Sequence, residues 1–129
     1  MESNVFYEEE GEGKCRVWAH FFLMGRDLVV GICGGEKPHI GALAVAEPRP
    51  SRDKPGVTSS TSSVITLYGH KDDIVAREAA DSLARETNRI ATVTAGIHVE
   101  NATKKEIEAL LENSRRLTKK IIKKINSLT

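Results

Sequence analysis

The stretch from Lys14 to Met24 constrains the fold of this chain more than any other part of the sequence. Its apolar side chains recur at every second residue, which is the period of a strand with one buried face. Residues 28–33 follow as a continuous, largely β-branched run, which is typical of a buried strand. These patterns predict that the first two-thirds of the chain consists mainly of strands.

The remaining elements are predicted from periodicity and from turn residues. Asp72 is the expected N-cap of one helix, and Thr103 with Glu106 forms a capping box at the start of another. Each helix has one apolar face, so both should cover a single face of the sheet. The predicted fold is α+β, with a mainly antiparallel sheet, two helices packed on one face and the order β-β-β-β-β-α-β-α. We expect additional strands at 5–7, 40–47, 64–68 and 90–99, and helices at 72–88 and 103–126.

The segment 47–63 stands out between two of the predicted strands. It holds three of the four prolines and ends in a run of serine and threonine. At roughly fifteen residues it is longer than most connections within a domain, and such loops often serve in binding. We therefore expect a mobile surface loop that closes over a ligand.

Length and charge exclude several classes of protein. The 129 residues predict a single domain spanning 1–129. A net charge of +1 argues against a nucleic-acid binder, whose footprint should be strongly basic. No apolar run reaches the ~20 residues of a membrane span, and the N-terminus lacks the basic start of a secretion signal. With only two cysteines and no disulfide framework, the expected location is the cytoplasm.

Three of the four histidines lie close to glycine at a predicted strand end or turn. They are His39, His70 and His98. Each by itself could be an ordinary turn residue whose ring bonds a carbonyl, but together they predict one shared pocket. We also expect this pocket to bind an anion, because the Gly34-Gly35 turn would expose backbone N–H groups beside Lys37. The starts of both predicted helices, which follow His70 and His98, would add free N–H donors.

A metal site is the alternative interpretation of the same histidines. Neutral imidazoles at His39, His70 and His98 could hold a divalent metal, with Asp72 or Asp73 as an oxygen ligand. The chain would then be a small metal-dependent enzyme. The sequence has no H-x-x-x-H or C-x-x-C pair to mark such a site.

The other chemically interesting residues are expected to be structural. His20 lies mid-strand beside aromatic residues and should be half-buried, and Cys15 and Cys33 should be packed thiols. The last helix carries eight lysines and arginines against three glutamates. That face is either solvated or a docking surface for an acidic partner, and the docking alternative would make the chain an assembly chaperone or interaction protein without a small ligand.

The histidine motifs resemble those of the prenylated-flavin chaperone-like family, typified by the small D subunit of gallate decarboxylase. The resemblance spans about residues 25–110 and rests on the order and spacing of three motifs. They are Gly34-Gly35 through Pro38-His39-Ile40-Gly41, then His70-Lys71-Asp72, then Thr94-Ala95-Gly96-Ile97-His98-Val99 followed by Asn101 and Thr103. The element order is also similar to that of small proteasome-assembly chaperones, in architecture only.

The resemblance implies a non-catalytic accessory protein of a UbiD-type decarboxylase. Such a protein would bind prenylated flavin mononucleotide (FMN), or plain FMN, or help to load the cofactor into the enzyme. Ala42 departs from the family pattern, because the gallate decarboxylase subunit has an acidic residue there. We also expect a homodimer, since two-fold pairs are the commonest assemblies. The implied cofactor-binding residues are Gly34, Gly35, Lys37, Pro38, His39, Gly41, His70, Lys71, Asp72, Gly96, His98 and Asn101.

Overall fold

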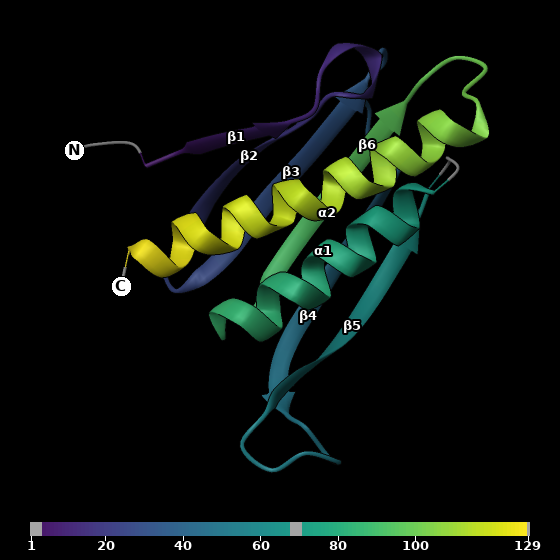
Figure 1. Ribbon diagram of the computed structural model, residues 1–129. Helices are drawn as coiled ribbons and strands as arrows, with labels where there is room; N and C mark the ends of the chain where they lie inside the picture. The colour runs from purple at the N-terminus through teal and green to yellow at the C-terminus, as the bar shows by residue number, and fades with distance from the viewer. Residues whose placement is uncertain (1–3, 68–70, 129) are drawn as a thin grey trace.

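Six strands form one mixed sheet in the computed structural model of this chain, which describes residues 4–67 and 71–128. Two helices complete the α+β fold, and the predicted order of strands and helices is confirmed (Figure 1). A short 3-10 helix, η1, was not predicted. The elements are β1 (Phe6–Glu10), η1 (Gly13–Cys15), β2 (Val17–Met24), β3 (Asp27–Gly35), β4 (Ala42–Pro50), β5 (Thr58–Thr66), α1 (Asp72–Thr87), β6 (Ala91–His98) and α2 (Lys104–Ser127).

The strands lie in the order β1-β2-β3-β6-β4-β5. A connection that contains η1 joins β1 to β2, and a tight turn joins β2 to β3, so that these three strands form an antiparallel meander. β4 and β5 form a hairpin. The last strand, β6, lies between these two units, parallel to β3 and antiparallel to β4. The sheet is therefore mainly antiparallel, as predicted, with one parallel pair, because the chain returns through α1 before β6 pairs with β3.

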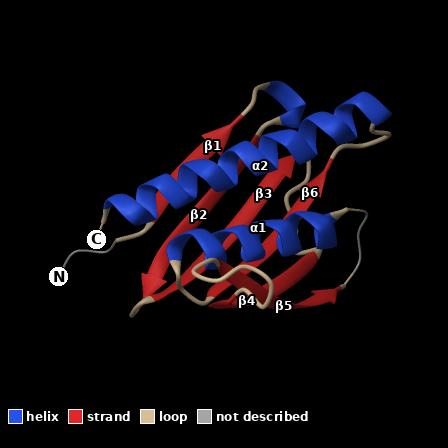
Figure 2. Ribbon diagram, turned by 60° about the horizontal axis from the view of Figure 1, so that its bottom comes forward, coloured by secondary structure: helices blue, strands red, loops and turns tan. Residues whose placement is uncertain are grey.

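Both helices lie on the same face of the sheet, as predicted (Figure 2). α1 packs on β4, β5 and β6, and α2 packs against α1, β1 and β2. Small residues let α1 approach the sheet closely, since Ala42, Ala44 and Ala46 of β4 are fully buried. The largest fully buried apolar side chains are Phe21, Leu28, Ile32, Leu83, Leu117, Ile121 and Ile125.

The two helices begin in different ways. The predicted capping box of α2 is confirmed: the Glu106 N–H donates to Thr103 Oγ1 over 3.1 Å, and the Thr103 N–H donates to Glu106 Oε1 over 2.9 Å. The predicted N-cap of α1 is wrong. Lys71 holds that position with a φ of 73° and no side-chain cap, and Asp72 is the first residue of the helix.

The long loop predicted over residues 47–63 is also wrong. β4 continues to Pro50, β5 begins at Thr58, and only residues 51–57 form the turn. β4 tolerates its prolines because its pairing with β6 ends at Ala46, so the strand has no neighbour on that side beyond this point. The turn lies at the opposite end of β4 from the start of α1 and cannot be a lid over the histidines (Figure 1).

The first strand is longer than the predicted 5–7, because β1 extends through the acidic segment to Glu10. Neither helix of the described residues is long and apolar enough to span a membrane.

Candidate functional site

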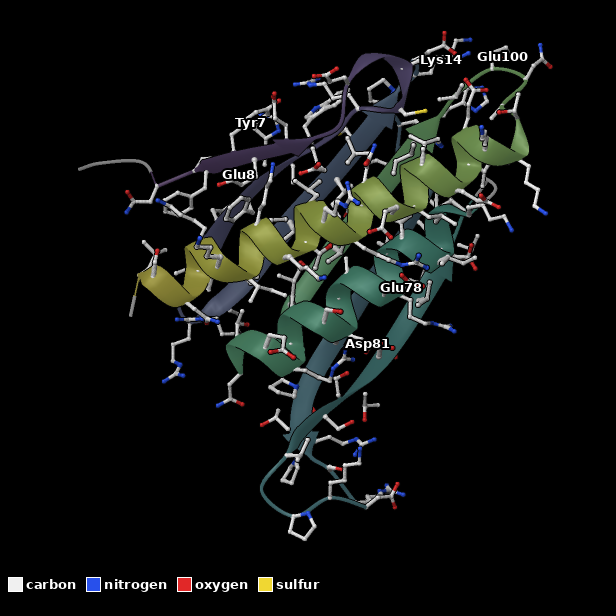
Figure 3. All side chains as sticks on the ribbon, viewed as in Figure 1. Tyr7, Glu8, Lys14, Glu78, Asp81 and Glu100 are labelled. Carbon is white, nitrogen blue, oxygen red and sulfur yellow. The ribbon has the colours of Figure 1, made fainter. Side chains whose placement is uncertain are left out.

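A cavity of about 820 Å³ lies where the ends of β3 and β6 meet the beginnings of α1 and α2. Figure 3 shows Glu100 at this end of the molecule, in the connection from β6 to α2. Apolar side chains of both helices, of β6 and of the residue that follows it form much of the wall, including Val75, Ile97, Val99, Leu110 and Leu111. Its polar side chains are Lys37, His39, Lys71, Asp72, His98 and Asn101.

The loop that carries His39 is bound to the end of β6 by backbone hydrogen bonds. The His98 carbonyl accepts from the N–H groups of Glu36 and Lys37 over 2.7 and 3.3 Å, and the Gly41 N–H donates to the Ala95 carbonyl over 2.9 Å. This loop crosses directly over Gly96, where a methyl group would overlap the His39 carbonyl. Gly96 is therefore needed for a close approach of the protein's own backbone.

Asp72 is the buried acid of the site, with 1% of its surface exposed. Its Oδ1 accepts a hydrogen bond of 3.0 Å from the Ile97 N–H. Its Oδ2 lies 3.1 Å from Nε2 of His39, at ion-pair distance but without a well-aligned N–H. A side chain at Gly41 would overlap this carboxylate, so Gly41 makes room for Asp72.

The pKa of Asp72 is raised, because burial disfavours its charged form. The Ile97 N–H and the neighbouring His39 ring act in the opposite direction, without cancelling the effect of burial. On the side of the His39 ring away from Asp72, Nδ1 lies 3.1 Å from the Lys37 carbonyl oxygen. His39 is thus held between a carboxylate and a carbonyl, in a position that fixes the ring against the wall of the cavity.

His98 joins His39 from the end of β6. The two rings are 6.4 Å apart between centroids and meet edge to face. Nε2 of His98 lies 3.0 Å from Glu100 Oε2, and this contact lowers the pKa of Glu100. The structure therefore brings together two of the three predicted histidines. His70 lies outside the described residues.

Gly34 and Gly35 do not form the predicted turn. Both glycines end β3 and pair with Ile97 and His98 of β6, and neither lines the cavity. The Gly35 N–H donates to the Arg16 carbonyl over 3.1 Å, so it is not free for a ligand. The capping box likewise occupies N–H groups at the start of α2. Of the two predicted helix N-termini, only that of α1 lacks a side-chain cap.

The metal alternative finds no support. Within residues 4–67 and 71–128, no group of three or more histidine, cysteine, aspartate or glutamate side chains could hold an ion. Cys15 and Cys33 are free and half-buried, and burial raises the pKa of both thiols. His20 is exposed on the face of the sheet without helices, so the expected half-burial is wrong.

The basic side chains of α2 are partly neutralised within the chain. Arg115 pairs with Glu78, and Lys120 pairs with Glu10 over 2.8 Å. Arg116 pairs with Glu112 of the same helix. These contacts favour a solvated face over a docking surface for an acidic partner.

The apolar wall is the part of the site that the sequence pattern did not reveal. Leu110 and Leu111 belong to the apolar stripe of α2, and that stripe predicted core packing. Leu110 is buried, whereas Leu111 is only half-buried, and both line the cavity. The periodicity of a helix cannot distinguish residues that reach the core from those that reach a neighbouring cavity.

Known proteins share both the sequence pattern and the fold. The family model of the prenylated flavin chaperone LpdD-like domain matches residues 11–126. Protein LpdD of Lactiplantibacillus plantarum is 30% identical over 106 residues, covering 78% of this chain and 70% of that protein.

A solved structure, described as a novel chaperone complex for yeast 20S proteasome assembly, contains a similar chain. The TM-score is 0.59 at 16% identity, and the alignment covers 96% of this chain and 95% of the other. At this identity the likeness concerns the fold alone. The match of the family model and the identity to protein LpdD show that this chain belongs to the prenylated flavin chaperone LpdD-like family.

Proposed function

We propose that this chain is a non-catalytic accessory protein that binds prenylated FMN and helps to load it into a UbiD-type decarboxylase. The family supports a chaperone-type role. The observation that carries the finer proposal is the cavity beside His39 and His98, which has an apolar wall and a basic rim. The working form in this proposal is a cytoplasmic homodimer.

The residues of the cavity fit a flavin nucleotide. Its volume of about 820 Å³ lies within the range of roughly 300–1,000 Å³ that is usual for pockets of small ligands. Val75, Leu110 and Leu111 offer an apolar surface for the ring system and its prenyl addition. Lys37 and Lys71 offer positive charge for the phosphate.

The other polar residues have distinct parts in the proposal. His98 and Asn101 lie at the cavity and would bond the polar edge of the flavin, while Pro38 would pack against it. His39 would orient the loop that carries Lys37, because both of its ring nitrogens already face groups of the protein. His70, which directly precedes Lys71, stays a candidate contact from the sequence.

Asp72 would keep its negative charge away from the phosphate. The carboxylate is buried, bonded to the Ile97 N–H and faced by the His39 ring, so it contributes to the architecture of the site and not to its rim. Gly41 and Gly96 also contribute to the architecture of the site. Gly41 leaves room for the Asp72 carboxylate, and Gly96 leaves room for the His39 carbonyl. In a UbiD-type enzyme the cofactor supplies the decarboxylation chemistry, whereas here it is cargo.

Direct titration tests the binding. Oxidised and reduced prenylated FMN, and FMN itself, are added to the wild type and to Lys37→Ala and His98→Ala. Lys54→Ala, in the turn at 51–57, and His20→Ala, on the opposite face, are matched controls. We expect at least a tenfold weaker affinity for the cavity variants, equal to about 1.4 kcal/mol, and unchanged affinity for the controls. Ligand at a hundred times its Kd should stabilise the wild type by about 2.7 kcal/mol.

Lack of binding by every form of the flavin would contradict the proposal and favour an interaction protein without a small ligand. Loading has its own test, in which the flavin-loaded chain is mixed with a cofactor-free UbiD-type decarboxylase. Activity should appear faster than with the same amount of free cofactor. Binding without this acceleration would leave a flavin-binding protein and remove the loading step from the proposal.

A further inference from the structure

The face of the sheet without helices exposes a concentration of apolar side chains. Side chains alternate along each strand, so the residues between the buried core positions point to this side. Both helices lie on the other side (Figure 2). We call this surface the open face and define it by Tyr7, Trp18, Phe22, Met24, Val45 and Ile65. At its edge Arg16 lies over the Trp18 ring, and the Tyr7 hydroxyl bonds with Arg16 and Glu9.

The exposure on this face is large for apolar residues. Met24 is 65% exposed, Ile65 57%, Val45 40% and Phe22 37%. Met24 and Phe22 lie on β2, whereas Val45 and Ile65 lie on β4 and β5. Val29 of β3 and Thr92 of β6 connect the two groups across the sheet. Continuous apolar surfaces of this kind usually mark an interaction site in a protein that is stable in water.

Charge is absent from the middle of the open face. One row across the sheet runs from Phe22 through Val29 and Thr92 to Val45, according to the strand register. None of these four side chains is charged, and Glu47 follows only at the next outward position of β4. A neutral centre with charge at the edge is the composition of a protein–protein interface.

The size of the open face suits a second copy of this chain. Six strands spaced about 4.8 Å apart, each about eight residues long at ~3.3 Å per residue, outline roughly 700 Å². A standard interface buries about 800 Å² on each partner. The neutral surface does not select a partner of opposite charge, and a net charge of +1 produces little repulsion between two copies.

We infer that two copies of this chain pack their open faces against each other. The homodimer would have two sheets in the middle, about 10 Å apart, and the helices outside. The cavity is walled by α1 and α2 and therefore lies on the side away from this interface. This inference rests on the proposed homodimer and is independent of the proposed flavin.

Sedimentation equilibrium tests the interface with a matched pair of substitutions. Val45→Glu places a charge on the open face, and Val57→Glu places the same charge in the turn at 51–57, where the valine is 47% exposed. We expect the wild type and Val57→Glu to have twice the 14.1 kDa mass of the chain. Val45→Glu should have the mass of one chain and an unchanged far-ultraviolet circular dichroism spectrum. Ile65→Lys replaces it if Val45→Glu does not fold.

Trp18 gives a second readout, because it is the only tryptophan of the chain and lies on the open face. Its emission should shift to longer wavelength when the wild type is diluted below its dissociation constant, with the midpoint that sedimentation gives. A monomeric wild type would overturn both the homodimer and the interface. A wild-type dimer that survives Val45→Glu and Ile65→Lys, or that Val57→Glu also dissociates, would overturn the interface and leave the homodimer standing.

Discussion

Replacing Gly96 by alanine should show how much the close crossing of the His39 loop over β6 contributes to the free energy of unfolding. The added methyl group would overlap the carbonyl of His39, and a backbone group cannot move aside as a flexible side chain can. The loop must therefore shift, and the hydrogen bonds that join it to β6 would weaken. Gly31→Ala is the matched control, because its methyl group would meet no heavy atom closer than 3.9 Å.

The expected cost can be estimated from the contacts. Three backbone hydrogen bonds join residues 36–41 to β6, and each contributes about 0.5–1.5 kcal/mol net. Alanine in a strand recovers roughly 0.5–1 kcal/mol relative to glycine. Gly96→Ala should therefore lower the free energy of unfolding by about 2–3 kcal/mol. With an unfolding entropy of about 2.1 cal/mol/K per residue, the melting temperature should fall by roughly 7–11 °C.

Urea denaturation and calorimetry at one protein concentration measure this cost for both variants. Because Gly31 belongs to a strand of the open face, sedimentation first establishes that the compared proteins are in the same association state. Gly31→Ala should change the free energy of unfolding by less than about 1 kcal/mol. If the two variants agree within about 0.5 kcal/mol, the close crossing of His39 over Gly96 does not determine the stability of this region.

Three further predictions concern the acid, the cap and the core. Burial raises the pKa of Asp72 above its ordinary value of 3.8, so the free energy of unfolding should fall as pH rises from about 4 to the raised pKa of the folded state. Asp72→Asn should remove this slope in urea titrations, and an unchanged slope would refute the assignment. Thr103→Ala removes the capping box of α2 and should cost about 1 kcal/mol by denaturation, whereas a neutral result would mean that packing alone fixes the helix start. Phe21→Ala should lower the free energy of unfolding by about 3–5 kcal/mol, because this side chain is fully buried. Phe22→Ala, on the open face, should lower it much less when the compared chains are in the same association state, and equal losses would contradict the assignment of faces.

Much of the secondary structure could be predicted because its causes are local. The alternation in β2 reflects a strand with one buried face, and Val17, Ala19 and Phe21 are indeed fully buried. The capping box of α2 depends only on two residues three positions apart. Proline misled the prediction at 47–63, since its effect on a strand depends on whether a neighbouring strand lies on that side.

The site itself depended on contacts between distant parts of the chain. Local sequence identified His39 and His98 as candidates, but nothing in it required β6 to lie between β3 and β4. That placement joins the end of β6 to the loop after β3 and brings the two rings within 6.4 Å. Strand order is set by the packing of whole elements, which residue periodicity does not encode.

The sequence alone determined the order and type of most elements, because backbone preference, capping and apolar period act over a few neighbouring residues. The extent of β4 and β5 is the exception, since it depends on which strands lie beside them. Only the tertiary structure decided that Asp72 is a buried acid facing His39, and not the cap of its helix. The fate of a polar side chain is decided by the partners that surround it once the chain has folded, and these come from residues distant in the sequence.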